Sequence, residues 1–64
     1  MALSENLKKI AKEKNISMYR IAKDGEISMS YVWDIFKGKQ ENPSLSILRK
    51  LSKVLDVSIE ELIG

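Results

Sequence analysis

The sequence predicts an all-α fold, a compact bundle of five helices. Serines suited to start helices recur along the chain, apolar residues repeat at helical spacing, and no segment alternates apolar and polar residues as a strand would. Few residues interrupt helices, since the only proline is Pro43 and the glycines are Gly25, Gly38 and Gly64. The predicted helices span residues 3–14, 18–24, 29–37, 45–55 and 59–63.

Three helix starts are predicted from serines. Ser17, Ser28 and Ser58 can each accept a hydrogen bond from a backbone N–H of a first helical turn. Glu61 follows Ser58 by three positions and completes a capping box. An apolar residue precedes each serine and another follows four positions later, which is the spacing of a hydrophobic staple: Ile16 with Ile21, Ile27 with Val32, and Val57 with Leu62.

Apolar stripes predict the first and fourth helices. The fourth helix is expected to start at Ser44 behind Pro43, and Asn42 is the alternative cap if Pro43 is the first helical residue. The lysines and the arginine beside these stripes are interpreted as a solvated face. The stripes consist of Leu3, Leu7, Ile10 and Ala11, and of Leu45, Leu48, Leu51, Val54 and Leu55.

Size and composition limit the possible functions. A chain of 64 residues is expected to form one domain over residues 1–64. It has no cysteine or histidine, so no disulfide, cofactor, metal site or catalytic residue is predicted, and we expect no enzymatic activity. The net charge of +2 is only a weak indication of an anionic partner. Neither a membrane-spanning run nor an apolar leader is present, so a cytoplasmic location with no membrane contact is expected.

The two predicted helices at residues 18–24 and 29–37 are the most informative about function. They are short, amphipathic, and separated by a turn that contains Gly25 and Glu26, which is the pattern of a helix-turn-helix unit. In such a unit the second helix enters the DNA major groove with its N-terminal residues leading. The first helix crosses the sugar-phosphate backbone and offers its N-terminal N–H groups to a phosphate.

The second of these helices has an unusual outer face. Its predicted inner face is Val32, Ile35 and Phe36. Exposed aromatic residues are typical of a binding surface, and the alternative is that Tyr31 or Trp33 folds over the rim of the core. The outer face consists of Met29, Ser30, Tyr31, Trp33, Asp34 and Lys37.

The order and spacing of these segments resemble the phage repressor and Cro family, also called the xenobiotic-response-element (XRE) family of bacterial regulators. The resemblance covers essentially all 64 residues. It implies a lambda-repressor-like domain with its helix-turn-helix at the second and third helices, and a transcriptional regulator, most often a repressor, that binds specific double-stranded DNA. The similarity rests on Ile16-Ser17 before Ile21-Ala22, Ile27-Ser28 before Val32 and Ile35, Lys37-Gly38-Lys39, Pro43-Ser44, and residues 55–63.

By position, the resemblance implies roles for individual residues. Base contacts fall on Met29, Ser30 and Asp34, with Tyr31 beside them. It also implies a homodimer that meets near the C-terminal end, with Ile59, Leu62 and Ile63 as candidates, and a near-palindromic operator. Contacts to the DNA backbone fall on Ser17, Met18, Trp33, Lys37, Lys39, Gln40 and Asn42.

The chain also departs from the family pattern. Met18 stands where glutamine is common, and Glu26 stands where the turn glycine is common, with Gly25 one position early. Ala11 and Phe36 replace a buried arginine–glutamate pair, so we expect Phe36 to pack near Ala11 in the core. A buried Phe36 would lose roughly 3–5 kcal/mol on truncation to alanine.

The side chains on the outer face of the segment 29–37 predict some of the base contacts. Asp34 can accept a hydrogen bond from cytosine N4, and its alternative role is that of a solvated carboxylate. Ser30 can pair with a donor or an acceptor, and Met29 and Tyr31 can pack on thymine methyl groups. The outer face has no arginine, glutamine or asparagine, so DNA shape is expected to contribute to specificity.

Two other functions fit the same residues. One is a protein-interaction module that uses the apolar side chains of this scaffold, and the other is the antitoxin of a toxin–antitoxin pair. The leading function is that of a bacterial or phage-encoded regulator that associates with the nucleoid. Its activity is expected to be controlled by its concentration, by a protein antirepressor or by proteolysis.

Overall fold

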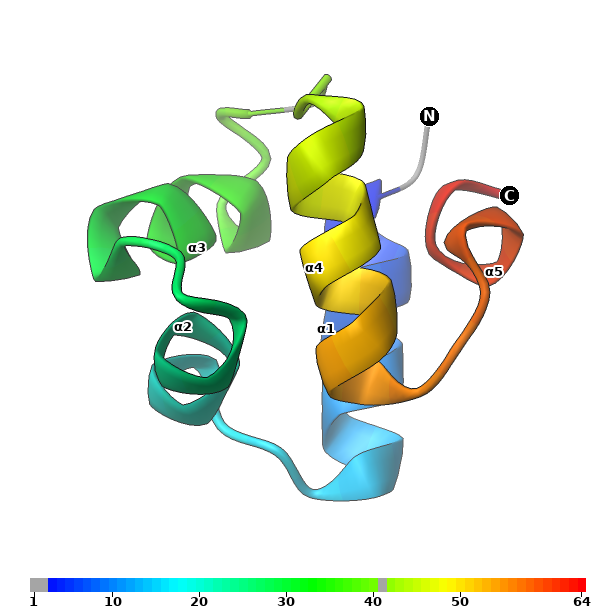
Figure 1. The fold of residues 1–64 in the computed structure, drawn as a ribbon. Coiled ribbons are helices and arrows are strands. Elements are labelled where there is room, and N and C mark those ends of the chain that lie inside the picture. The colour runs from blue at the N-terminus through cyan, green and yellow to red at the C-terminus, as the bar shows by residue number, and fades with distance from the viewer. Residues whose placement is uncertain (1–2, 41) are drawn as a thin grey trace.

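The computed structural model describes residues 3–40 and 42–64, and within these ranges it contains helices and no strand. The predicted all-α fold is therefore confirmed, and each helix boundary agrees with the prediction to within one residue. The helices, shown in Figure 1, are α1 (Leu3–Lys14), α2 (Met18–Gly25), α3 (Met29–Phe36), α4 (Leu45–Leu55) and α5 (Ile59–Ile63).

Four serines start helices by the same chemistry. The hydroxyl oxygens of Ser17, Ser28 and Ser58 each accept the backbone N–H three residues later, at a distance of 3.1 Å in every case. Ser44 does the same for α4 at 3.3 Å, so the alternative cap at Asn42 is wrong. Glu61 Oε1 completes the capping box by accepting the Ser58 N–H. These bonds satisfy first-turn donors that have no partner inside the helix.

The helices are arranged around α1 and α4, which lie side by side in the middle of the molecule (Figure 1). The α2 and α3 helices contact each other on one side, and α5 packs on α1 and α4 on the other side. The helix-turn-helix pair and the last helix therefore present separate surfaces, and α1 and α4 form the frame that supports both.

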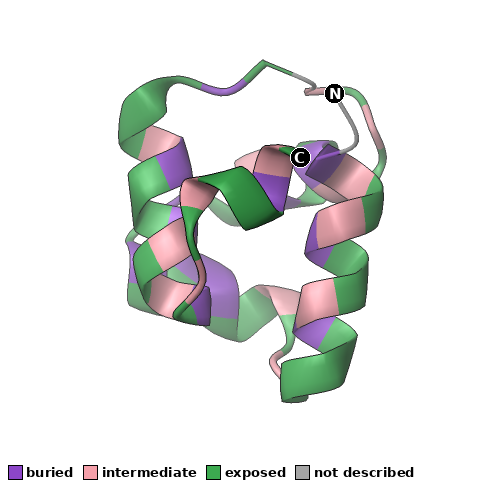
Figure 2. Cartoon of the chain, turned by 90° about the vertical axis from the view of Figure 1, so that its right-hand side faces the viewer, coloured by how far each residue is buried: buried purple, intermediate pink, exposed green. Residues whose placement is uncertain are grey.

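The core is made of one apolar stripe from each helix. Figure 2 shows buried and exposed residues alternating along the helices, as amphipathic helices require. Among the described residues no polar or charged side chain is buried. The fully buried side chains come from all five helices and are Leu3, Leu7, Ile21, Val32, Ile35, Leu51, Leu55 and Leu62.

Two predicted core positions are corrected by the structure. Phe36, the last residue of α3, packs against the core but is half-buried rather than enclosed in it. Leu45 belongs to the predicted stripe of the fourth helix but is 55% exposed, since it is the first residue of α4 at the end of the bundle.

Side-chain hydrogen bonds tie the helix ends to the frame. The Ser4 hydroxyl donates to the Phe36 carbonyl at 2.7 Å and holds the end of α3 against α1. Asn6 Nδ2 donates to the Leu62 carbonyl at 2.9 Å and holds α5 against the same helix. Both carbonyls lie in last turns, where the helix itself provides no donor.

Candidate nucleic-acid interface

A three-residue turn joins α2 to α3. Glu26 takes the left-handed backbone conformation, with φ of 54°, and ends α2. The Ile27 N–H then donates to the Ala22 carbonyl at 2.9 Å, which anchors the turn on the preceding helix. Ser28 is extended and caps α3. This short connection fixes how α3 projects from α2.

The displaced glycine has a structural role of its own. Gly25 is buried, and a Cβ there would lie 3.1 Å from Ile27 Cδ1 and 3.3 Å from Val54 Cγ2. The bare glycine therefore allows the turn to pack closely on α4. The left-handed conformation falls on Glu26, at the position where the family commonly has glycine, and a residue with a Cβ is disfavoured there.

The outer face of α3 carries two exposed pairs. Met29 is 42% exposed and Trp33, one turn later, is 46% exposed. Ser30 and Asp34 form a second exposed pair at the same spacing. Residues four apart on a helix are surface neighbours, so the two pairs form adjacent apolar and polar rows.

The opposite face of α3 fixes this orientation. Val32 and Ile35 have no exposed surface, so rotating α3 about its axis would expose apolar core. Tyr31 is half-buried and packs against the core, so the alternative in which it covers the rim holds for this residue. It does not hold for Trp33, whose side chain is exposed on the outer face.

The segment after α3 folds back on the helix. The N–H groups of Lys39 and Gln40 both donate to the Asp34 carbonyl, at 2.9 and 3.2 Å. Gly38 has φ of 79°, a conformation that favours glycine, and it reverses the chain at this point. Lys37 and Lys39 are consequently held at the C-terminal end of α3 with exposed side chains. Gln40 is half-buried and Asn42 is exposed.

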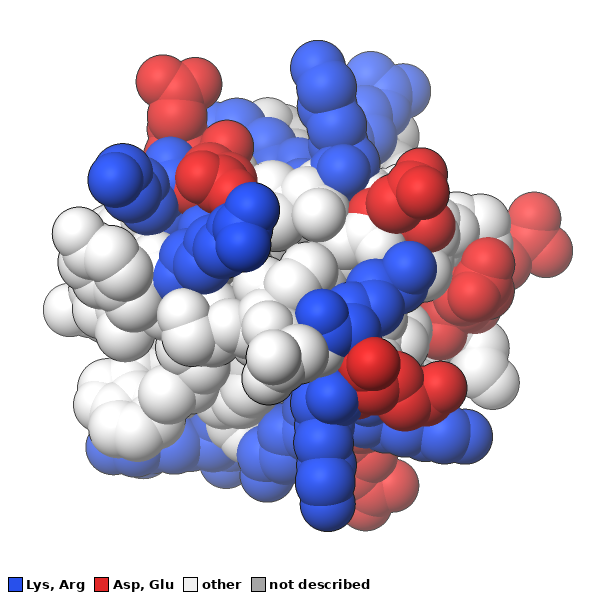
Figure 3. Space-filling model, turned by 90° about the horizontal axis from the view of Figure 1, so that it is seen from below, with Lys and Arg blue, Asp and Glu red and all other residues white. Residues whose placement is uncertain are grey.

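The start of α2 forms a second edge of the candidate interface. Ser17 is exposed and Met18 is half-buried against the core. Tyr19 is 66% exposed, and the sequence analysis missed it. The helical period gives the signal, because Tyr19 is two positions before the buried Ile21 and so faces the opposite side of α2. In Figure 3 uncharged side chains gather on the side where α2 and α3 lie in Figure 1.

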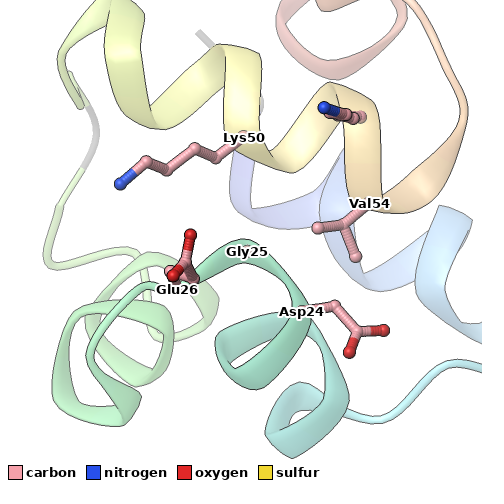
Figure 4. A pocket seen from close by; sticks show the side chains of 6 residues that line it. Asp24, Gly25, Glu26, Lys50 and Val54 are labelled. Atoms are coloured by element: carbon pink, nitrogen blue, oxygen red, sulfur yellow. The ribbon is translucent and has the colours of Figure 1, made fainter.

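A hollow lies between the end of α2 and α4 (Figure 4). It is open to solvent, with a volume of about 430 Å³. Asp24 and Glu26 line one side, and Lys50 and Lys53 of α4 line the other. All four charged side chains are exposed, and Val54 and the bare Gly25 form the floor.

Within residues 3–40 and 42–64 no group of three or more His, Cys, Asp or Glu residues is placed to hold a metal ion. None of the described helices has the length and apolar character needed to cross a membrane.

The predicted dimer contacts need one correction. Leu62 is fully buried between α5 and the frame, so its side chain is not available to a second chain. The helix periodicity explains this, because the residue four positions after the Ser58 cap faces the core. Ile59 and Ile63 are half-buried and keep some surface exposed.

Comparison with known proteins agrees with this geometry. A family model described as helix-turn-helix matches residues 7–62, and the chain belongs to that family. It is 36% identical over 62 residues to the HTH-type transcriptional regulator SinR of Bacillus licheniformis, covering 97% of this chain and 56% of the relative. It is 30% identical over 64 residues to the immunity repressor protein of Bacillus phage phi105, covering 100% of this chain and 44% of that protein.

A third relative extends the same pattern. The HTH-type transcriptional regulator SlrR of Bacillus subtilis is 37% identical over 51 residues, covering 80% of this chain and 34% of the relative. The chain thus spans about half the length, or less, of the curated relatives it matches. No solved structure matches it significantly.

Proposed function

We propose that this chain is the sequence-specific, double-stranded DNA-binding domain of a transcriptional regulator, and that the regulator is a repressor. The observation that carries the proposal is the outer face of α3, where Ser30 and Asp34 are exposed while Val32 and Ile35 behind them are buried. A short helix held in this way can enter the major groove with its N-terminal residues leading. The names of the relatives, regulators and an immunity repressor, support the same function.

The proposed DNA contacts fall into two sets. Base edges are contacted by Met29, Ser30 and Asp34, with Tyr31 at the edge of the set because its ring is half-buried. The backbone set has lysines at the end of α3 and free N–H groups at the start of α2, both suited to phosphates. It comprises Ser17, Met18, Trp33, Lys37, Lys39, Gln40 and Asn42.

The assembly we propose is a two-fold homodimer on a near-palindromic operator. Its recognition helices would lie about 34 Å apart, one turn of DNA. Ile59 and Ile63 on α5 are the remaining dimer candidates, and they lie on the side of the molecule opposite α2 and α3 (Figure 1). Residues 1–64 form one domain in this proposal, and it acts by binding rather than catalysis, in the cytoplasm and on the nucleoid. A protein antirepressor is a candidate partner.

Selection of bound sequences from a random duplex pool tests the function. We expect a preferred site with two related halves, and an affinity that falls steeply as salt concentration rises, because bound phosphates release counterions. Enrichment of no sequence, or an affinity for duplex DNA that does not depend on salt, would contradict the proposal.

A second candidate is a protein-interaction module, and the exposure of Tyr19, Met29 and Trp33 favours it. Exposed apolar side chains gathered on one face suit a protein partner as well as a groove. An antitoxin would combine both activities. The same experiment separates them, since a module that binds only protein enriches no duplex.

A further inference from the structure

We propose that Met29, supported by Trp33, reads the 5-methyl group of thymine, so that each preferred half-site has a thymine facing the first turn of α3. This inference rests on the proposed DNA-binding function and adds the base that Met29 recognises. The apolar row is defined as Met29 and Trp33.

The position of Met29 suits it to this role. It is the first residue of α3, directly after the Ser28 cap, and 42% of its surface is exposed. The first turn is the part of a recognition helix that approaches base edges. A thioether chain is flexible and apolar, so it can follow a small methyl group without needing a hydrogen bond.

Trp33 extends the apolar row by one turn. It is 46% exposed, and the Nζ of Lys37 lies 4.9 Å from the centroid of its ring. A cation over an indole face restricts the ring and places a positive charge at the far end of the row. The row therefore runs from an apolar tip to a cation suited to a phosphate.

The side chains of α3 and its cap lack the commonest specific base contact, which is a bidentate contact to guanine. Residues 28–36 contain no Lys, Arg, Asn or Gln. Guanine presents two acceptors in the major groove, and these residues lack the cationic side chain that commonly binds them. Thymine is the base that presents an apolar group there. The parallel polar row of Ser30 and Asp34 can accept hydrogen bonds from the amino groups of cytosine or adenine beside that thymine.

Deoxyuridine substitution tests the inference directly. It removes the methyl group of thymine and leaves every hydrogen-bonding group in place. In the site obtained from the duplex pool, each thymine is replaced in turn, and the affinities of the wild-type protein and of Met29→Ala are measured. We expect at least one replacement per half-site to weaken wild-type binding about fourfold, the equivalent of one buried methyl-sized group.

The variants decide which residue is responsible. Met29→Ala should bind the thymine and uracil duplexes equally, while Lys39→Ala should weaken both and keep the difference between them. Circular dichroism checks that Met29→Ala stays folded, which its exposure favours. A selected site without thymine at the α3 contacts, no uracil effect, or an equal effect in wild type and Met29→Ala would overturn the inference and leave the DNA-binding function standing. A pool that enriches nothing overturns both.

Discussion

The Nζ of Lys37 lies 4.9 Å from the centroid of the Trp33 ring, at the C-terminal end of α3. Both side chains are exposed, so this cation–π contact is worth about 0.5–1 kcal/mol. The contact also orders two side chains before DNA binds. Preordered side chains lose less conformational entropy on binding, which favours affinity.

Lys37→Ala should therefore weaken binding to all duplexes to a similar degree. The lysine contacts phosphate rather than bases in the proposed complex, so the slope of log affinity against log salt should fall by about one. Lys9→Ala is the matched control, because Lys9 lines a groove beside α5, on the other side of the molecule. Equal affinities and equal slopes for the two variants would contradict the placement of Lys37.

Two capping serines, Ser28 at α3 and Ser58 at α5, provide a matched pair of variants. Ser28→Ala and Ser58→Ala each remove one N-cap bond of 3.1 Å, so each should lower the free energy of unfolding by about 1 kcal/mol. Only Ser28→Ala should also weaken binding to a duplex that holds a single half-site, because it loosens the turn that carries Met29 and Ser30, whereas Ser58 caps the helix of the proposed dimer contacts. Urea unfolding and duplex titration measure the two effects. A similar loss of DNA affinity in Ser58→Ala would show that the loss follows from stability alone.

Glu26→Gly should stabilise the domain by roughly 0.5–1 kcal/mol, because Glu26 has φ of 54° and glycine adopts this conformation without a steric penalty. Asn15→Gly is the control. Asn15 has a similar φ of 57°, but asparagine tolerates the left-handed region, so its gain should be smaller. Urea midpoints of both variants check this. A loss of stability in Glu26→Gly would mean that its side chain makes a contribution in the turn.

Phe36→Ala should cost about 1–3 kcal/mol, less than the value expected for a core phenylalanine, because the side chain is only half-buried. Leu51→Ala is the comparison, and its fully buried side chain should cost roughly 2–5 kcal/mol. Thermal and urea unfolding of both variants measure the order. A larger loss for Phe36→Ala than for Leu51→Ala would restore the predicted core position.

Helix positions could be predicted because their causes are local. A serine cap, the staple around it and an apolar stripe all lie within a few residues of one another, so Ser17, Ser28 and Ser58 indicated three starts correctly. The same reasoning identified Val32 and Ile35 as the inner face of α3.

Contacts between distant segments could not be predicted in this way. The bonds from Ser4 to Phe36 and from Asn6 to Leu62 join residues 32 and 56 positions apart, and no local pattern marks either partner. The predictions of burial at the helix ends were wrong for the same reason. Phe36 and Leu45 have apolar character and correct spacing, but whether another helix covers them depends on the assembled bundle.

The most direct test of the central claim is to repeat the duplex selection with Asp34→Asn. If α3 presents Asp34 to base edges, the variant should change its preference at one base pair of each half-site, from cytosine toward adenine, because an amide pairs with adenine N6 and N7. All other positions should keep their preference, and Lys39→Ala should return the wild-type site at lower affinity. An unchanged site for Asp34→Asn would contradict the claim that this face of α3 reads DNA.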